Sequence, residues 1–311
     1  MMKHLILVLV IFLQVVLAYG QQQQVLTQYF NHILTFNPAY AGHQSTGEVN
    51  VAYRNQWLGL EGSPEFQLAN FNTSLFDDRV GAGIGLMRSS MAISSELTAN
   101  AYYSYRIQFK PGVLSLGVQA SVKNFTSDFN DSRIVTTQPR DIDPSIPMEN
   151  GSVTVPNFGF GIFFNAKNYF LGLSAPRMLQ NNIDFAGDGF TSRERLHSYF
   201  TAGYSYEVNR EISIQTTMLA KYVQGSPLDL DLTLFFRFVE RMGFGMNYRF
   251  RDEFNSLQGE SLSFIINASA SSQLMIGFSY DMALSRLKDF HGGSLELFVR
   301  YNLPEGKDKS P

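Results

Sequence analysis

The sequence predicts an all-β protein, a transmembrane antiparallel up-and-down β-barrel of about fourteen strands. Three observations lead to this prediction. Apolar and polar residues alternate along most of the chain, the alternating segments are long, and the connections between them differ in length in a regular way.

The alternation is clearest in residues 228–238, LDLDLTLFFRF, where every even position is Leu or Phe. The odd positions include Asp229, Asp231, Thr233 and Arg237. Segments 272–282 and 196–208 repeat this pattern. Because successive side chains of a strand point to opposite faces, each segment is expected to form a strand with one apolar face and one polar face.

The alternating segments are too long for an ordinary soluble sheet. Candidate strands lie near 46–57, 64–76, 79–91, 95–109, 112–125, 153–165, 168–175, 196–208, 211–222, 228–239, 242–250, 259–268, 272–282 and 293–302. Most reach the ~9–11 residues of a tilted membrane-crossing strand, whereas soluble strands are mostly ~5–6 residues.

The connections between these segments alternate between long and short. The longer ones are QWLGLEGSP, RSSMAISS, 126–152, 176–195, RDEFNSLQ and 283–292, and the shorter ones include FDDR, KPG, NAKN, VNRE and VERM. Outer-membrane barrels have short periplasmic turns and long outer loops. An even strand count then predicts that both termini are periplasmic. Since the first and last strands of a closed barrel are neighbours, loops 57–64 and 283–293 are expected to meet at the outer rim.

Composition agrees with a barrel and excludes several other classes. Only 16% of the residues are charged, against a usual ~25%, so the apolar faces are expected to contact lipid and the polar faces to line the lumen. A net charge of -3 gives no reason to expect nucleic acid. The chain has no Cys and five scattered His, which predicts neither a metal site nor a cofactor. Loop 126–152 contains five acidic residues without EF-hand spacing, which favours a solvated loop over a calcium site.

The ends of the chain carry the signals of an exported protein. Residues 1–20 combine Lys3, an apolar stretch and a small-residue cleavage site, so we interpret them as a signal peptide; the alternative is a membrane anchor. The expected organisation is then an N-terminal strap or plug segment over 21–45, a barrel over 46–302 and a periplasmic tail over 303–311.

Four stretches together resemble the PorP/SprF family of Bacteroidetes outer-membrane proteins. They are FNPAYAG (36–42), R-x-QW-x-G-x-x-G-x-P beginning at Arg54, LGLSAPRMLQ (171–180) and YDMALSRLKDFHGGSLELFVRY (280–301). The resemblance implies a protein of the type IX secretion and gliding motility machinery that binds large secreted surface adhesins through their C-terminal domain. It also implies periplasmic components of the apparatus as partners and no catalysis. Leu295-Glu296 depart from the His-Glu that the family often shows.

Several residues are candidates for contact with a partner. Trp57 ends the first strand on the outer side and is either an interfacial belt residue or an exposed anchor. Gly59 and Gly62 are expected to form turns beside it, and Arg286 and His291 lie in the loop expected to meet it. Arg54 is expected to face the lumen and pair with Glu296 or Glu48.

The stretch TFNPAYAG (35–42) precedes the first strand. Pro38 cannot continue a strand, and Asn37 before it is restricted to an extended conformation. Tyr40 lies between two alanines that allow close packing. We hypothesise that residues 25–42 fold back into the lumen or across its periplasmic mouth; the alternative is a strap along the rim.

Three classes of function remain open on the sequence. The first is a partner-binding barrel, and the second is a pore or transporter for small or hydrophobic solutes, which such an N-terminal segment would plug. The third is an outer-membrane enzyme, for which His197 with Ser198 is the one candidate pair. Adjacent residues of a strand point to opposite faces, so this pair predicts no enzyme.

Overall fold

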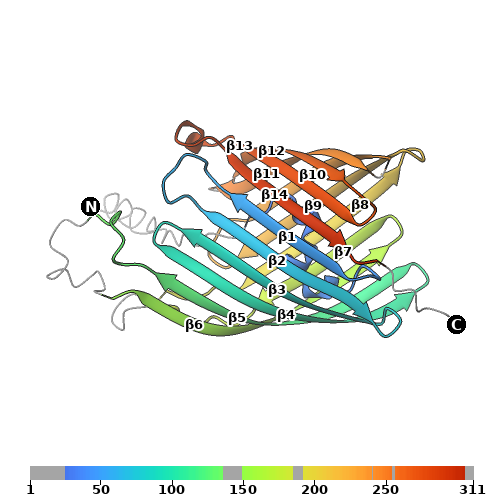
Figure 1. Ribbon diagram of the computed structural model, residues 1–311, viewed down its shortest axis with the longest axis horizontal. Helices are drawn as coiled ribbons and strands as arrows, with labels where there is room; N and C mark the ends of the chain where they lie inside the picture. The colour runs from blue at the N-terminus through green and yellow to red at the C-terminus, as the bar shows by residue number, and fades with distance from the viewer. Residues whose placement is uncertain (1–24, 136–148, 185–191, 240, 254–255, 305–311) are drawn as a thin grey trace, which may run out of the picture.

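A computed structural model of the protein describes residues 25–135, 149–184, 192–239, 241–253 and 256–304. Within these residues fourteen strands form one closed antiparallel barrel (Figure 1). Each strand pairs with its neighbours in sequence, and β1 pairs with β14 to close the sheet. The predicted all-β, up-and-down barrel is therefore confirmed. The proposed signal peptide and most of the tail lie outside the described residues.

The barrel follows a short helical segment. The strands are β1 (Glu48–Asn55), β2 (Glu65–Leu75), β3 (Val80–Met91), β4 (Ser94–Phe109), β5 (Gly112–Ser127), β6 (Gly151–Ala166), β7 (Tyr169–Arg177), β8 (His197–Glu207), β9 (Ile212–Val223), β10 (Asp229–Phe238), β11 (Met242–Glu253), β12 (Ser256–Ser269), β13 (Leu274–Ala283) and β14 (Ser294–Asn302). The short helices are η1 (Tyr29–Asn31), α2 (Ile33–Phe36), η2 (Pro38–Tyr40) and η3 (Arg286–Asp289). No helix among the described residues is long and apolar enough to span a membrane.

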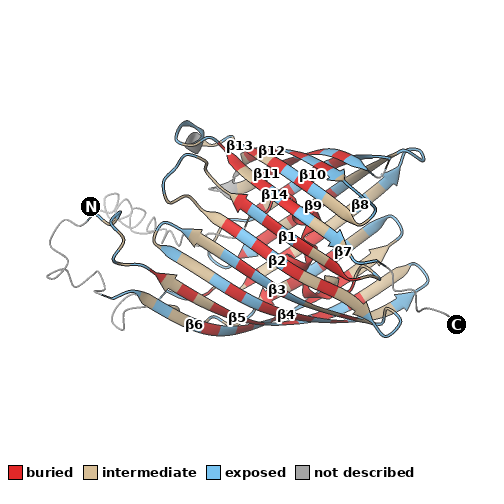
Figure 2. Ribbon diagram, in the orientation of Figure 1, coloured by how far each residue is buried: buried red, intermediate tan, exposed pale blue. Residues whose placement is uncertain are grey.

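Burial along the strands is the reverse of that in a soluble protein. On β10, Asp231 and Thr233 are buried, whereas Leu232 and Leu234, which alternate with them, are about 40% exposed. Figure 2 shows the same alternation of buried and exposed residues along neighbouring strands. Since apolar faces point out and polar faces point in, the outer surface suits hydrocarbon and the barrel is a membrane barrel.

The two ends of the barrel differ. At one end, which we call the loop end, β1–β2, β5–β6, β7–β8 and β13–β14 are joined by long connections. At the other, the turn end, β2–β3, β4–β5 and β6–β7 are joined by two to four residues. The expected contrast in length is therefore present for most connections.

The prediction of two long loops is wrong. RSSMAISS is almost entirely strand, because β3 ends at Met91 and β4 begins at Ser94. The hydroxyls of Ser94 and Ser95 hydrogen-bond those of Ser127 and Thr126 on β5 at 2.8 and 2.7 Å, so polar residues extend the sheet here. RDEFNSLQ is likewise mostly strand, with only residues 254–255 between β11 and β12.

Candidate functional site

Residues 25–42, which we call the luminal segment, lie inside the barrel. Leu26, Tyr29, Phe36 and Ala41 are each no more than 2% exposed. Leu26, Tyr29 and Phe36 share one apolar cluster with inward-facing wall residues, among them Ala52, Leu219, Phe235, Ile265 and Phe298, and Ala41 packs in another cluster with Tyr102 of β4. The buried residues in the middle of the barrel in Figure 2 mark this packed region. The lumen is thus occupied by the protein's own chain, not only by side chains of the wall.

The luminal segment runs from the loop end to the turn end. Thr27 contacts Glu296 and Asp281, which lie near the loop-end termini of β14 and β13. Gly42 donates its N–H to the side chain of Asn72, near the turn end of β2. The first described residue, Val25, and the last, Pro304, therefore lie toward opposite ends of the barrel. The expectation that both termini are periplasmic placed them at the same end; residues 1–24 and 305–311 are outside the described range.

A buried charged network holds the start of the luminal segment. The Arg54 guanidinium lies 2.5 Å from Asp281 and 3.3 Å from Glu296. Glu296 also accepts the backbone N–H groups of Thr27 and Gln28 at 2.7 and 2.9 Å. Arg54 therefore pairs with Glu296, one of its two expected partners. A buried carboxylate is tolerated when an ion pair and hydrogen bonds compensate its desolvation, and Glu296 has both.

Hydrogen bonds from wall side chains continue along the segment. The Tyr29 hydroxyl lies 2.9 Å from the hydroxyl of Thr217, and burial raises the pKa of Tyr29 above its usual range. Arg300 donates to the backbone oxygen of Asn31 at 2.6 Å and pairs with Glu48 at 3.4 Å. Glu48, the second expected partner of Arg54, thus forms its ion pair with Arg300 instead.

His32 is a buried titratable residue of this segment whose ring lacks hydrogen bonds within the described part of the chain. It is 1% exposed, and neither ring nitrogen has a hydrogen-bond partner among the described residues. Its ring meets Phe298 edge to face at 5.2 Å. Burial, together with the charge of Arg300, lowers the pKa of His32 to about 3, so the imidazole is neutral in the lumen.

TFNPAYAG forms the second half of the luminal segment. The Asn37 side chain accepts the N–H of Ala39 at 3.0 Å and donates to the backbone oxygen of Ile162 on β6 at 3.0 Å. It thereby caps η2, in which Pro38 takes the first position, where its missing N–H costs nothing. The Tyr40 ring meets Phe163 of β6 edge to face at 5.4 Å. The residues that shape this local turn, such as Asn37, are therefore also the residues that contact the wall.

Glycines of the wall give this backbone room. A Cβ added at Gly117 would overlap the backbone of Ala39, and one at Gly81 would overlap the backbone oxygen of Ala41. A Cβ at Gly161 would overlap the Asn37 side chain. We call Gly81, Gly117 and Gly161 the glycine track. It explains why luminal positions on three separate strands carry no side chain.

The loops at the ends of β1 and β13 join into one structure. The backbone N–H of Leu58 bonds the oxygen of Gly293 at 2.8 Å, and the N–H of Gly292 bonds the oxygen of Leu58 at 2.7 Å. The N–H of Trp57 donates to the hydroxyl of Ser294 at 3.2 Å. The expected approach of loops 57–64 and 283–293 is therefore present, and we call the pair the joined loops.

The joined loops bring the candidate partner-binding residues together. The rings of Trp57 and His291 lie 6.1 Å apart. Gly59 and Gly62 have φ of 88° and 71°, which suits their expected role in turns. Trp57 has φ of 60°, an uncommon value for a bulky residue. Arg286 begins η3 in the same loop, and its side chain lies outside the described part of the structure.

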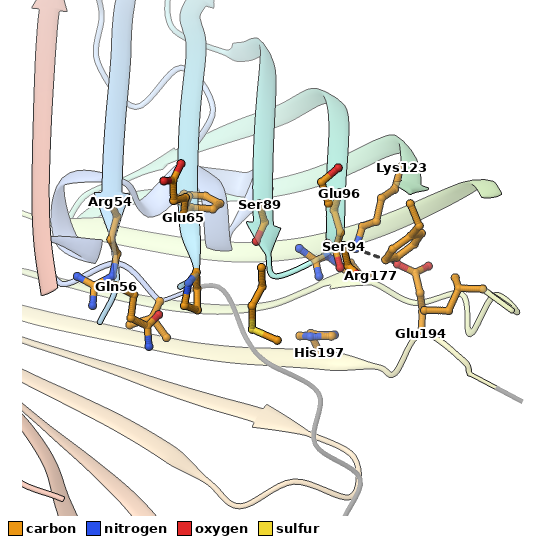
Figure 3. Close-up of a pocket in the computed structure, with 17 residues that line it drawn as sticks. Arg54, Gln56, Glu65, Ser89, Ser94, Glu96, Lys123, Arg177, Glu194 and His197 are labelled. Atoms are coloured by element: carbon orange, nitrogen blue, oxygen red, sulfur yellow. Dashed lines mark ion pairs between the residues drawn. The ribbon is translucent and has the colours of Figure 1, made fainter. Parts of the chain in front are cut away.

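A cavity of about 270 Å³ lies at the loop end, bordered by Val25 of the luminal segment (Figure 3). Its polar lining includes Arg177 of β7 and Lys123 of β5, whose ammonium lies 3.1 Å from Glu194 and 3.4 Å from Glu96. His197, the one candidate for catalysis, also borders the cavity, and its Nδ1 contacts the backbone oxygen of Arg195 at 2.7 Å.

Acidic side chains form no candidate metal centre among the residues that the structure describes. In loop 126–152, Asp131 pairs with Arg133 at 2.6 Å. Asp141 and Asp143, part of the acidic set considered for calcium, lie outside the described residues.

Sequence reasoning missed two parts of this site. Asp281 is the closer partner of Arg54, and Arg177 and Glu194 line the cavity. The signal for Asp281 was available, because it occupies the polar face of β13, and β13 adjoins the last strand, which in turn adjoins the first. Arg177 had no such signal, because a bulge decides where its side chain points.

Comparison with known proteins yields one family and a set of structures. The profile of a family described as Type IX secretion system membrane protein PorP/SprF matches residues 18–301. No curated protein matches the chain.

Similar solved structures are membrane barrels of low sequence identity. The CymD monoaromatic hydrocarbon channel is 9% identical, with a TM-score of 0.55 over 91% of this chain and 94% of that one. A TodX monoaromatic hydrocarbon channel mutant is 11% identical, with a TM-score of 0.50 over 88% and 94%. An Acinetobacter baumannii outer membrane protein is 6% identical, with a TM-score of 0.49 over 84% and 100%. At these identities the likeness concerns the fold alone.

Proposed function

The chain belongs to the PorP/SprF family of type IX secretion membrane proteins, and from this premise we propose that it binds a large secreted surface adhesin at its loop end. The adhesin would be held through its C-terminal domain, and the barrel would support its export or its attachment to the cell surface. In this orientation the loop end faces outward and the turn end faces the periplasm, where other components of the apparatus are the further candidate partners.

The joined loops are the observation that carries this proposal. Backbone hydrogen bonds fix the two loops to each other and therefore fix the position of Trp57. Phe290 is 73% exposed and Leu60 is 44% exposed on the same two loops. Exposed aromatic residues on a rigid frame are the usual anchors of protein interfaces, since little entropy is lost when they are buried.

The occupied lumen supports a partner-binding role over that of a pore. Residues 25–42 cross the lumen from one end to the other and are held at Glu296, Arg300 and Asn72. An open porin would require a continuous polar channel. The hydrocarbon channels among the similar structures share the fold, but a shared fold does not indicate that this barrel carries the same substrates.

Affinity purification of the tagged full-length barrel from native membranes tests this function. We expect a very large surface protein to copurify with the wild type. Trp57→Gly and replacement of loop 283–293 should abolish its recovery. Arg210→Ala, in the exposed β8–β9 turn at the opposite end, is the matched control and should leave recovery unchanged. Equal recovery by all variants, or recovery of no such protein by the wild type, would contradict the proposal.

A further inference from the structure

The cavity at the loop end holds a guanidinium that has no counterion among the described residues. Arg54 is paired with Asp281 and Glu296, and Lys123 with Glu194 and Glu96. Arg177 lines the cavity and has no ion pair or side-chain hydrogen bond to any described residue. Figure 3 shows its side chain among the lining residues, close to Lys123. An anion beside Arg177 would offset the repulsion between this half-buried cation and Lys123.

A β-bulge directs Arg177 into the lumen. Ser174 of β7 pairs with Tyr199 of β8, but the next pair is Arg177 with His197, so β7 has one extra residue here. Strict alternation from the inward Ser174 would point residue 177 toward lipid. The bulge reverses this, and bulges commonly re-aim a functional side chain in this way. This irregularity in β7 therefore directs the guanidinium of Arg177 into the cavity.

Among the residues that the structure describes, no carboxylate pairs with Arg177. Glu194 and Glu96 are engaged with Lys123. Glu65, the remaining carboxylate of the lining, lies on β2 and forms no ion pair with Arg177. Residues 21–24, which precede Val25 in the chain, are all Gln and carry no negative charge. Within the described part of the chain, the cavity therefore has no anion for Arg177, and the carboxylate of a bound molecule would supply one.

We propose that this cavity binds a carboxylate of a peptide, with Arg177 as its ionic partner. A guanidinium holds a carboxylate through two parallel hydrogen bonds, which fixes direction as well as position. Phe66, Met91 and Phe125 supply apolar lining for the neighbouring side chain. The carboxylate is either the C-terminus of the chain or an acidic side chain near it; both present the same group.

The luminal segment already lies next to the cavity. Glu296 accepts two consecutive backbone N–H groups of the luminal segment, and Val25 of that segment borders the cavity itself. A second peptide in the cavity would therefore lie next to the start of the luminal segment, beside a wall carboxylate that already binds backbone N–H groups. This inference rests on the proposed function, in which the loop end faces a protein partner.

Binding of labelled peptides to the purified full-length barrel tests the site. The probes are acetyl-Gly-Ser-Val-Leu-Phe with a free C-terminus, the same peptide as an amide, an amide ending in Glu, and benzoate as a carboxylate without a peptide. The free acid or the Glu peptide should bind and the plain amide should not. Arg177→Gln should weaken that binding by at least about tenfold, since a charge-assisted pair is lost. Arg88→Gln, at an exposed position on β3, should not change it.

Equal binding of acid and amide, or an unchanged affinity in Arg177→Gln, would overturn the site. Benzoate binding as tightly as the peptides would overturn the assignment to a peptide. The outcome of the adhesin experiment is independent of this one. If Trp57→Gly loses capture of the surface protein but the barrel binds no peptide, only the inference about the cavity is refuted. Peptide binding without capture of any surface protein refutes the proposed function.

Discussion

Arg54 and Glu296 are 242 positions apart in the chain, and their side chains meet at 3.3 Å where the first and last strands pair. Glu296 also accepts the N–H groups of Thr27 and Gln28. One carboxylate therefore takes part both in the seam that closes the barrel and in holding the luminal segment. Closure of the sheet and docking of the segment are physically coupled through this residue.

Removing the cation of this seam should destabilise the barrel. Arg54→Met leaves Asp281 and Glu296 buried without their ionic partner, and the breaking of such a buried pair typically costs about 3–5 kcal/mol. Urea unfolding of the barrel in lipid vesicles measures the loss. Arg88→Met, at an exposed position with no ion pair to described residues, is the control and should unfold like the wild type. Coincident unfolding curves for all three proteins would refute the coupling.

A side chain on the glycine track should displace TFNPAYAG. In Gly117→Val, the added atoms overlap the backbone of Ala39, which cannot move aside without leaving the wall. The chain has no native Cys, so Ala39→Cys gives a single reporter thiol, 2% exposed in the native residue. We expect slow maleimide labelling in the Ala39→Cys background and fast labelling once Gly117→Val is added.

Gly292→Ala is the matched control for this experiment. Its added Cβ has no neighbour closer than 3.5 Å, an ordinary contact distance. Labelling in the control should remain slow. Equally slow labelling with Gly117→Val would show that the segment does not need the track.

Acidification should loosen the luminal segment through His32. The docked imidazole has a pKa of about 3, against 6.5 for a free one, so protonation favours the undocked segment. The stabilisation is complete above pH 6.5 and is lost progressively as the pH falls from 6.5 toward 3. Within that window docking weakens by about tenfold per pH unit.

His32→Phe removes this titration and keeps an aromatic ring against Phe298. Ionic conductance in planar bilayers should rise between pH 6.5 and 4.5 more steeply for the wild type than for His32→Phe. Identical pH profiles would mean that His32 does not control docking.

Trp57→Gly should separate binding from folding. Glycine tolerates φ of 60° and relieves the backbone, whereas the loss of an aromatic anchor typically costs an interface about 2 kcal/mol or more. We expect an equally stable barrel whose affinity for its partner falls roughly thirtyfold. Thermal unfolding and partner titration measure the two quantities. Undiminished affinity would assign Trp57 to the interfacial belt.

The sequence was sufficient for the fold because the lipid and the lumen impose opposite polarities on adjacent residues. Asp231 and Leu232 show this directly, since one is fully buried and the other 39% exposed. Residues 88–95 do not follow this rule. Polarity there indicated a loop, but serine hydroxyls paired between strands and continued the sheet.

The site was only partly predictable. Asn37, Pro38 and Tyr40 were singled out because their chemistry is local: Pro38 has a fixed φ and restricts Asn37 to an extended conformation, and Tyr40 lies between alanines. The capping of η2 by Asn37 was not predicted. The path of the segment from the loop end to the turn end depends on contacts between residues more than a hundred positions apart, such as Asn37 with Ile162. The orientation of Arg177 depends on a single extra residue in β7, which no periodicity reveals.

The most direct test compares the conductance of the intact barrel with that of a variant lacking residues 25–42. Both are measured in planar bilayers at pH 7.5. If the luminal segment seals the lumen and the protein acts through its loop end, the intact barrel stays closed and the deletion variant forms stable, salt-dependent channels. An intact barrel that conducts as well as the deletion variant would contradict this account.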